Sequence, residues 1–157
     1  MSITVGVQAP NFTLTDTNKQ PVTLSELKGH NVLLLFFPFA FTSTCTKELC
    51  GVRDDIANYT NFDAKVYGIS VDAVYTLIKY KEDQALNFDL LSDFNKEASM
   101  AYESYYETFN FGMRGVSKRS AFLIDKEGII QYAEVLENAS EIPNLDAIKS
   151  LLQTINQ

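Results

Sequence analysis

The sequence predicts a single α/β domain in which a mixed β-sheet is covered by helices on both faces. Its 157 residues suffice for one domain with a substantial core, and 46% hydrophobic with 21% charged residues is an ordinary globular balance. Residues 32–37 form an apolar run without alternation, which indicates a strand buried on both faces. Segments with helical spacing alternate with further short apolar strands. No repeat, low-complexity run or Pro/Gly-rich linker divides residues 1–157.

The N-terminal part predicts a β-hairpin. Residues 12–15 and 22–24 have the composition of two short strands, and the polar residues 16–20 join them. Residues 25–29 then predict one short helical turn, with Ser25 as its cap and Gly29 as its stop.

The centre of the chain predicts alternating strands and helices. Pro38 ends the buried strand, and a helix is expected from Thr42 or Ser43, both good caps, to about Tyr59. The apolar positions of this helix recur every three to four residues, at Leu49, Val52, Ile56 and Tyr59 or Thr60. The segments after it are predicted as a core strand at 66–71, a helix at 74–85, a short strand at 88–91 and a weak helix at 96–105.

The C-terminal part predicts a second hairpin and a closing helix. Strands at 121–124 and 129–133 flank the turn sequence Asp-Lys-Glu-Gly at 125–128. A terminal helix would place one apolar stripe on the sheet, formed by Leu145, Ile148, Leu152 and Ile155. This order of elements is that of a thioredoxin-like fold. Ligands in such sheets gather beyond the carboxyl ends of the strands, so chemistry is expected just after Phe37.

Charge and hydropathy exclude two classes of partner. The net charge of −7 argues against nucleic acid, because phosphate binding needs clustered Lys and Arg. No stretch approaches the roughly 18 consecutive apolar residues of a membrane span. Residues 1–6 lack the basic start and apolar run of a secretory signal. These features favour a cytoplasmic protein.

Two cysteines, Cys45 and Cys50, are the main chemical feature. In a reducing compartment such a pair is more often catalytic, redox-active or simply buried than a structural disulfide. Two cysteines and the remote His30 do not make a four-ligand zinc set, so neither a metal nor another cofactor is predicted.

Cys45 is expected in the first turn of the helix that follows Pro38. There the unpaired N–H groups and the positive end of the helix dipole stabilise a thiolate and lower the pKa of a thiol. Thr42 is in reach of the sulfur or of a substrate oxygen above it, and Pro38 offers a rigid wall that excludes water. The alternative is a buried cysteine that fills core space.

The pattern Pro-x-x-x-Thr-x-x-Cys, formed by Pro38, Thr42 and Cys45, resembles the active-site signature of the peroxiredoxins of the AhpC/TSA superfamily. Residues 6–14 and 118–130 resemble the opening segment and the late arginine strand and hairpin of that family. The resemblance covers nearly the whole chain. It implies a thiol-dependent peroxidase that reduces hydrogen peroxide and organic hydroperoxides.

The resemblance also implies roles for the site residues. Cys45 would be the peroxidatic cysteine, which peroxide oxidises to a sulfenic acid, while Thr42 binds the peroxide and Pro38 shields the site. Arg119 would stabilise the thiolate and the charge that develops on the breaking O–O bond.

Glu48 would orient that arginine. The alternatives are a surface ion pair for Arg119 and a solvated helix acid for Glu48, with Arg53 and Arg114 as further candidate arginines.

Cys50 is open to two interpretations. Its spacing from Cys45 matches the resolving cysteine of the bacterioferritin-comigratory (Q-type) branch, which implies an intramolecular disulfide recycled by thioredoxin or a similar thiol donor. Residues 39–42 and 133–139 resemble the AhpE-like branch, which often works with one cysteine and an external thiol. Cys50 is then a buried helix residue. The AhpE-like resemblance also suggests a homodimer with contacts near the active-site loops.

Two rival functions and one aromatic cluster stay open. A thiol–disulfide oxidoreductase of the same fold would want Cys-x-x-Cys, whereas four residues lie between these cysteines. A non-catalytic redox-sensing module would retain the fold with an ordinary Cys45. The cluster could serve core packing or a subunit contact, and it comprises Tyr102, Tyr105, Tyr106, Phe109 and Phe111.

Overall fold

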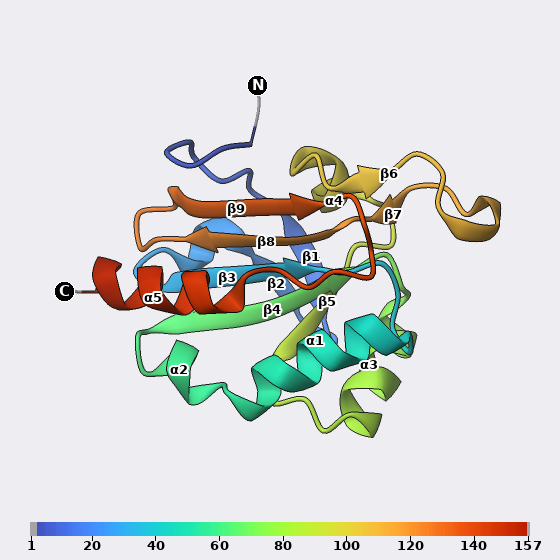
Figure 1. Cartoon of the computed structure of the whole chain (residues 1–157), viewed down its shortest axis with the longest axis horizontal. Coiled ribbons are helices and arrows are strands. Elements are labelled where there is room, and N and C mark those ends of the chain that lie inside the picture. Colours follow the sequence, from blue (N-terminus) through green and yellow to red (C-terminus); the bar gives the residue numbers. More distant parts are fainter. Residues whose placement is uncertain (1–2, 157) are drawn as a thin grey trace.

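A seven-stranded mixed sheet forms the centre of the computed structural model, which describes residues 3–156 (Figure 1). Its strand order is β2-β1-β5-β4-β3-β8-β9. In chain order the elements are β1 (Thr13–Asp16), β2 (Pro21–Thr23), the 3₁₀ turn η1 (Leu24–Leu27), β3 (Asn31–Phe36), α1 (Ser43–Asp54), α2 (Ala57–Thr60), β4 (Ala64–Ser70), α3 (Val74–Asp83), β5 (Asp89–Ser92), α4 (Glu97–Ala101), β6 (Tyr105–Tyr106), the 3₁₀ turn η2 (Asn110–Gly112), β7 (Val116–Ser117), β8 (Arg119–Ile124), β9 (Ile130–Leu136) and α5 (Leu145–Ile155).

The sheet is mixed because β3 pairs in parallel with β4 and antiparallel with β8. Every residue of β3 is buried, as its unbroken apolar run predicts. β1 and β2 form the predicted N-terminal hairpin, and β8 and β9 form the second one. The predicted α/β class and mixed sheet are therefore confirmed.

Two hydrophobic layers lie on the two faces of the sheet. Alternate residues of β3 point to opposite faces. Leu33 and Leu35 pack with the larger helices α1, α3 and α5, while Leu34 and Phe36 pack with η1, α4 and the N-terminal segment. Helices thus cover both faces, with the longer ones on one side. No helix within residues 3–156 is long and apolar enough to cross a membrane.

The helix predicted from Thr42 or Ser43 to Tyr59 is wrong in its length. The chain leaves the helix at Asp55, whose backbone (φ −119°, ψ 18°) is no longer helical, and the short α2 begins at Ala57. The Asp55 carboxylate accepts hydrogen bonds from Asn58 and Lys149, and such local bonds compete with helix continuation. The apolar spacing persists across this break because α1 and α2 cover the same face of the sheet.

Smaller differences follow from local backbone geometry. The predicted helical turn is η1, which begins one residue before Ser25, so Ser25 is not its cap. Gly29 follows with a φ of +98° and does end this turn. The weak helix predicted at 96–105 is reduced to α4. The predicted absence of a leader at residues 1–6 falls partly on residues 1 and 2, which lie outside the described residues.

Sheet topology places the site. The register pairs Phe36, the last residue of β3, with Ser120 of β8. Arg119 therefore lies beside the carboxyl end of β3, where the chain turns through residues 37–42 into α1. The N-terminal turn of α1 and the first residue of β8 meet at this end of the sheet (Figure 1).

Candidate active site

Cys45 is the third residue of α1, and its side chain has no exposed surface. This position lies in the first helical turn, where N–H groups lack helical partners and favour a negative charge. Thr42 is the N-cap residue, but its hydroxyl donates to the Phe39 carbonyl at 2.9 Å rather than to the helix. The first turn therefore keeps its capacity to stabilise an anion.

Arg119 joins three acceptors beneath the pocket that Pro38 and Thr42 line. Its Nη2 lies 3.1 Å from Cys45 Sγ, and its Nη1 lies 2.8 Å from Glu48 Oε1. Nε and Nη2 also donate to the Ala139 carbonyl, at 3.1 and 2.9 Å. The guanidinium is 1% exposed, so it is not a surface ion pair. Burial opposes its charge, but Cys45 and Glu48 outweigh burial and raise the pKa of Arg119.

Glu48 is buried one turn after Cys45, so it is not a solvated helix acid. Its Oε1 accepts from Arg119, whereas its Oε2 has no hydrogen-bond partner among residues 3–156. Burial raises the pKa of Glu48 from 4.5 to about 7, against the opposing effect of Arg119. Glu48 therefore changes its charge near neutral pH while it holds the arginine.

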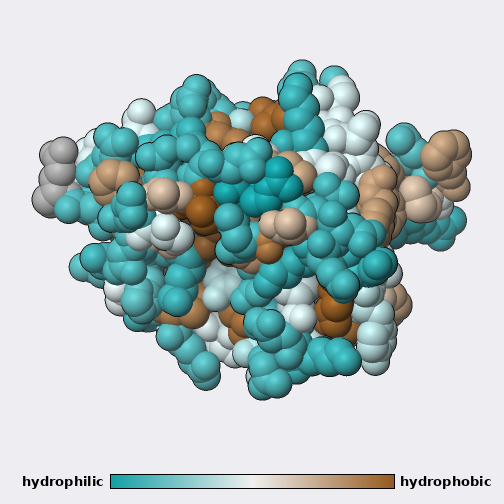
Figure 2. All heavy atoms as spheres, turned by 90° about the horizontal axis from the view of Figure 1, so that it is seen from below, coloured by the Kyte–Doolittle hydropathy of each residue, from teal (hydrophilic) through white to brown (hydrophobic). Residues whose placement is uncertain are grey.

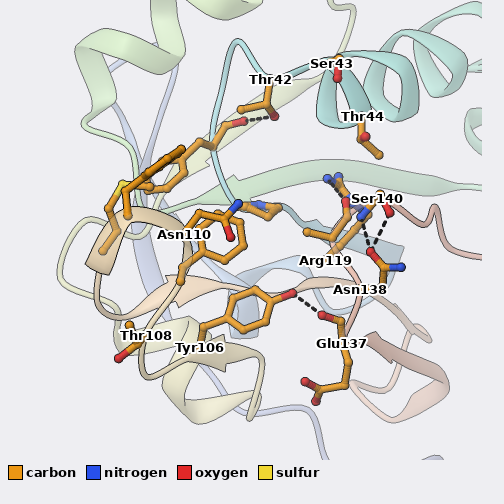
Figure 3. Close-up of a pocket in the computed structure, with 16 residues that line it drawn as sticks. Thr42, Ser43, Thr44, Tyr106, Thr108, Asn110, Arg119, Glu137, Asn138 and Ser140 are labelled. Atoms are coloured by element: carbon orange, nitrogen blue, oxygen red, sulfur yellow. Dashed lines mark hydrogen bonds between the residues drawn. The ribbon is translucent and has the colours of Figure 1, made fainter.

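A pocket of about 680 Å³ opens in front of these groups (Figure 3). Pro38, Thr42 and Thr44 line one side together with Arg119, and residues 137–140 line another. The remaining wall is aromatic and apolar, and it contains Tyr106, Phe109, Phe111 and Met113. Figure 3 shows Tyr106 donating to the Glu137 carbonyl, at 2.7 Å, which ties this wall to the end of β9.

The loop between β3 and α1 is held by a residue that sequence reasoning missed. Asp72, just after β4, accepts from the Ala40 N–H at 2.8 Å and from the Ser70 hydroxyl at 2.6 Å. Phe41 then adopts a φ of +67°, which is unusual for a residue with a side chain. This turn aims the chain from the buried strand into α1. The Ala139 carbonyl was also missed, because no side-chain pattern marks a backbone acceptor.

Cys50 and the two other candidate arginines lie apart from this cluster. Cys50 Sγ donates to Gln84 Oε1 at 3.5 Å, and both cysteines are free. Arg53 pairs with Asp54 at 2.8 Å and donates to the Gln84 carbonyl, while Arg114 is exposed. Of the six residues predicted for the site, five gather around the pocket and its floor, and Cys50 does not. Within residues 3–156 no group of three His, Cys, Asp or Glu side chains could hold a metal ion.

Comparisons with known proteins agree with this geometry. Residues 5–133 match the model of the AhpC/TSA family. The chain is 40% identical over 136 residues to alkyl hydroperoxide reductase E of Mycobacterium tuberculosis, which covers 85% of this chain and 86% of that protein. It is 33% identical over 156 residues to peroxiredoxin Bcp of Bacillus subtilis, which covers 99% and 96%.

Solved structures give the same assignment. The crystal structure of peroxidoxin BcpB from Mycobacterium tuberculosis superposes with a TM-score of 0.86 at 28% identity, over 98% of each chain. Peroxiredoxin Q of Xylella fastidiosa, at 20% identity and a TM-score of 0.87, shares the fold. A thiol-bearing helix start under a pocket is thus found in a chain whose relatives are thiol peroxidases. The chain belongs to the AhpC/TSA family of peroxiredoxins and is a thiol-dependent peroxidase.

Proposed function

We propose that Cys45 is the peroxidatic cysteine and that Arg119 activates it. The observation that carries this proposal is the 3.1 Å contact between Arg119 Nη2 and Cys45 Sγ at the first turn of α1. The Cys45 thiolate attacks one oxygen of a hydroperoxide, so that an S–O bond forms and the O–O bond breaks. The leaving oxygen takes a proton and departs as water or an alcohol, and Cys45 becomes a sulfenic acid.

Charge stabilisation is the main contribution of the site in this scheme. Negative charge spreads from sulfur over the two peroxide oxygens in the transition state, and a fixed guanidinium with nearby helix N–H groups stabilises it. Glu48 and the Ala139 carbonyl fix the orientation of Arg119. Thr42 would donate its hydroxyl to the bound peroxide in exchange for its present bond to Phe39. Pro38 would exclude water.

We further propose that Cys50 resolves the sulfenic acid. Its thiolate attacks the Cys45 sulfur, a disulfide forms and water leaves, after which a dithiol such as thioredoxin reduces the disulfide. On an intact helix, residues five apart have Cα atoms roughly 8 to 9 Å apart, and a disulfide needs less than about 7 Å. Because α1 is continuous from Ser43 to Asp54, resolution requires residues 46–49 to unwind.

The variants Cys45→Ser and Cys50→Ser test both proposals. Cys45→Ser should abolish peroxide reduction, since a neutral hydroxyl is a far weaker nucleophile than a thiolate. Cys50→Ser should still be oxidised rapidly by one equivalent of peroxide but lose turnover with thioredoxin. Normal turnover of Cys50→Ser with thioredoxin would instead establish a one-cysteine enzyme that uses an external thiol.

The pocket supports a substrate range that includes organic hydroperoxides as well as hydrogen peroxide. The ring pairs Phe39–Phe109 and Tyr106–Phe109, with centroids 6.2 and 4.9 Å apart, present apolar surface near Arg119. Stopped-flow oxidation by hydrogen peroxide and by cumene hydroperoxide measures the preference. A rate advantage for cumene hydroperoxide that disappears in Phe109→Ser would assign it to this wall.

A homodimer through the loop between β6 and β7 is the assembly we propose. Tyr102 belongs to the core, whereas Phe111 is 98% exposed at the tip of this loop. Figure 2 shows brown and tan atoms at the end of the molecule where the loop projects. Aromatic side chains of this kind are enriched at interfaces. Sedimentation that shows only monomer at high concentration would overturn this assembly. We also propose a cytoplasmic location, where free cysteines stay reduced.

A further inference from the structure

Two hydrogen bonds fasten the reactive part of α1 to the end of α3. The Thr46 and Tyr80 hydroxyls lie 2.8 Å apart, and Cys50 Sγ donates to Gln84 Oε1 at 3.5 Å. Thr46 and Cys50 are four residues apart on α1, and Tyr80 and Gln84 are four residues apart at the end of α3. Residues with this spacing share one helix face, so the two bonds join matching faces of the two helices.

Tyr80 also contacts the chain on the other side of Cys45. Its buried ring lies 4.9 Å from the Phe41 ring and 6.3 Å from the Phe37 ring, measured between centroids. It therefore touches residues both before and after Cys45. Burial raises the pKa of Tyr80 to about 12, so the hydroxyl stays protonated at any working pH. A neutral, fully buried tyrosine is a durable clamp on this turn.

Gln84 holds more than the Cys50 thiol. Its backbone carbonyl accepts from Arg53 Nη1 at 2.5 Å, one turn beyond Cys50. The Gln84 side chain and backbone thus bind two successive positions of α1. While the Cys50 thiol donates to Gln84, it is held on the side of α1 that faces α3.

We propose that Tyr80 and Gln84 are positioning residues that form a latch, which sets the rate at which Cys50 is released to the oxidised Cys45. This inference rests on the proposed resolution by Cys50, because unwinding of residues 46–49 carries Thr46 and Cys50 away from α3. Both bonds must break before the disulfide can form. The latch therefore slows resolution and preserves the folded helix that attacks peroxide.

The latch also sets the sensitivity of the enzyme to excess peroxide. A sulfenic acid that waits in the folded site can react with a second hydroperoxide, which adds an oxygen to sulfur, gives a sulfinic acid and releases water or an alcohol. Disulfide formation removes the sulfenic acid from this reaction. A weaker latch should therefore favour the disulfide, and a stronger one the sulfinic acid.

Tyr80→Phe removes the bond to Thr46 and keeps the ring. A hydrogen bond of this kind has a net value that corresponds to about three- to tenfold in an equilibrium constant. Formation of the Cys45–Cys50 disulfide, followed by quenched-flow mass spectrometry after one equivalent of hydrogen peroxide, should accelerate by about that factor. Oxidation of Cys45 to the sulfenic acid should change by less than about twofold. The sulfinic fraction at excess peroxide should fall.

Tyr102→Phe is the matched control. Tyr102 is equally buried and donates to the Pro10 carbonyl at 2.7 Å, but it packs on the opposite face of the sheet from α1. It undergoes the same chemical change, so it reports the effect of destabilisation alone. Gln84→Met tests the second bond, since methionine keeps the side-chain length and removes the carbonyl acceptor. It should also accelerate disulfide formation, by less than Tyr80→Phe does, because thiols are weak donors.

Amide exchange of the reduced proteins gives a second, independent readout. Residues 46–50 should exchange faster in Tyr80→Phe than in Tyr102→Phe and in the unaltered protein. Equal disulfide rates in Tyr80→Phe and Tyr102→Phe would overturn the latch while Cys50 remained the resolving cysteine. Absence of any Cys45–Cys50 disulfide in the unaltered protein would overturn the resolution mechanism itself and the latch with it.

Discussion

Arg119 Nη2 lies 3.1 Å from Cys45 Sγ, across 74 residues of chain. Antiparallel pairing of β8 with β3 produces this contact, because it brings the start of one strand to the end of the other. Glu48 and the Ala139 carbonyl then fix the guanidinium from two further directions. The arginine is therefore oriented before any substrate arrives, and such preorganisation is what gives a charge its catalytic value.

Arg119→Lys should raise the pKa of Cys45 and slow its oxidation by about 10²–10³. A lysine keeps the charge, but its single ammonium cannot reproduce a planar fork that bonds sulfur, carboxylate and carbonyl together. Stopped-flow oxidation and alkylation of Cys45 across pH measure the two effects. Arg114→Lys is the matched control, since Arg114 is exposed at the same end of the sheet. Unchanged kinetics in Arg119→Lys would transfer the role to Arg53 or Arg114.

Glu48 should give the protein a stability that falls as the pH rises towards neutrality. Burial raises the pKa of Glu48 from 4.5 to about 7, so the folded protein holds this proton more tightly than the unfolded chain. The contribution of Glu48 is then fully present below about pH 4.5 and is lost as the pH rises through about 7, with a range of at most about 3 kcal/mol.

Urea unfolding of the unaltered protein and of Glu48→Gln at pH 4.5, 6 and 7.5 checks this dependence. The difference between the two free energies of unfolding should shift with pH in the sense given, because glutamine does not titrate. A difference that stays constant over this range would show that Glu48 does not change its charge there. Arg119 should remain near Cys45 in Glu48→Gln, since the amide oxygen can still accept from it.

The parts of the site that could be predicted from sequence are those that lie on one continuous segment or match a known pattern. Pro38, Thr42 and Cys45 sit between a strand and a helix, and local rules place both elements. Arg119 came from resemblance to a family, since nothing in residues 37–54 specifies a partner that lies 74 residues away.

Contacts made by single polar groups across the sheet could not be predicted. The Ala139 carbonyl is a backbone atom, and Asp72 reaches Ala40 only because β3 and β4 are neighbours. The break at Asp55 depends on Lys149 of a helix that packs later in the chain. The strands β6 and β7 are two residues long, which is too short to show alternation. Each of these features requires tertiary structure.

Gly68→Ala should destabilise the protein by about 1–3 kcal/mol through overpacking behind the active-site helix. A Cβ at this position of β4 would lie 2.7 Å from Leu90 Cδ2, 3.2 Å from Phe37 Cε1 and 3.7 Å from Leu49 Cδ2. Phe37 precedes the Pro38 loop and Leu49 belongs to α1, so the strain reaches the site from below. Thermal unfolding should show a lower midpoint than for Gly51→Ala, where an added Cβ meets nothing within 4 Å. Equal midpoints would show that the core yields without cost.

Oxidation of both cysteines should unfold α1 locally, and this is the sharpest consequence of the proposed resolution. The disulfide cannot form on a helix that is intact from Ser43 to Asp54, because the geometry of five-residue spacing keeps the two Cα atoms too far apart. Amide exchange and limited proteolysis should therefore be faster at residues 42–56 in the oxidised protein than in the reduced one. The terminal helix α5 packs on the same face of the sheet and serves as the internal reference, since its exchange should be nearly unchanged. Cys50→Ser treated with one equivalent of peroxide is the control, because its sulfenic acid has no internal partner and α1 should stay protected. Equal protection of residues 42–56 in oxidised and reduced protein, with the disulfide verified by mass, would mean that the two cysteines meet without unwinding.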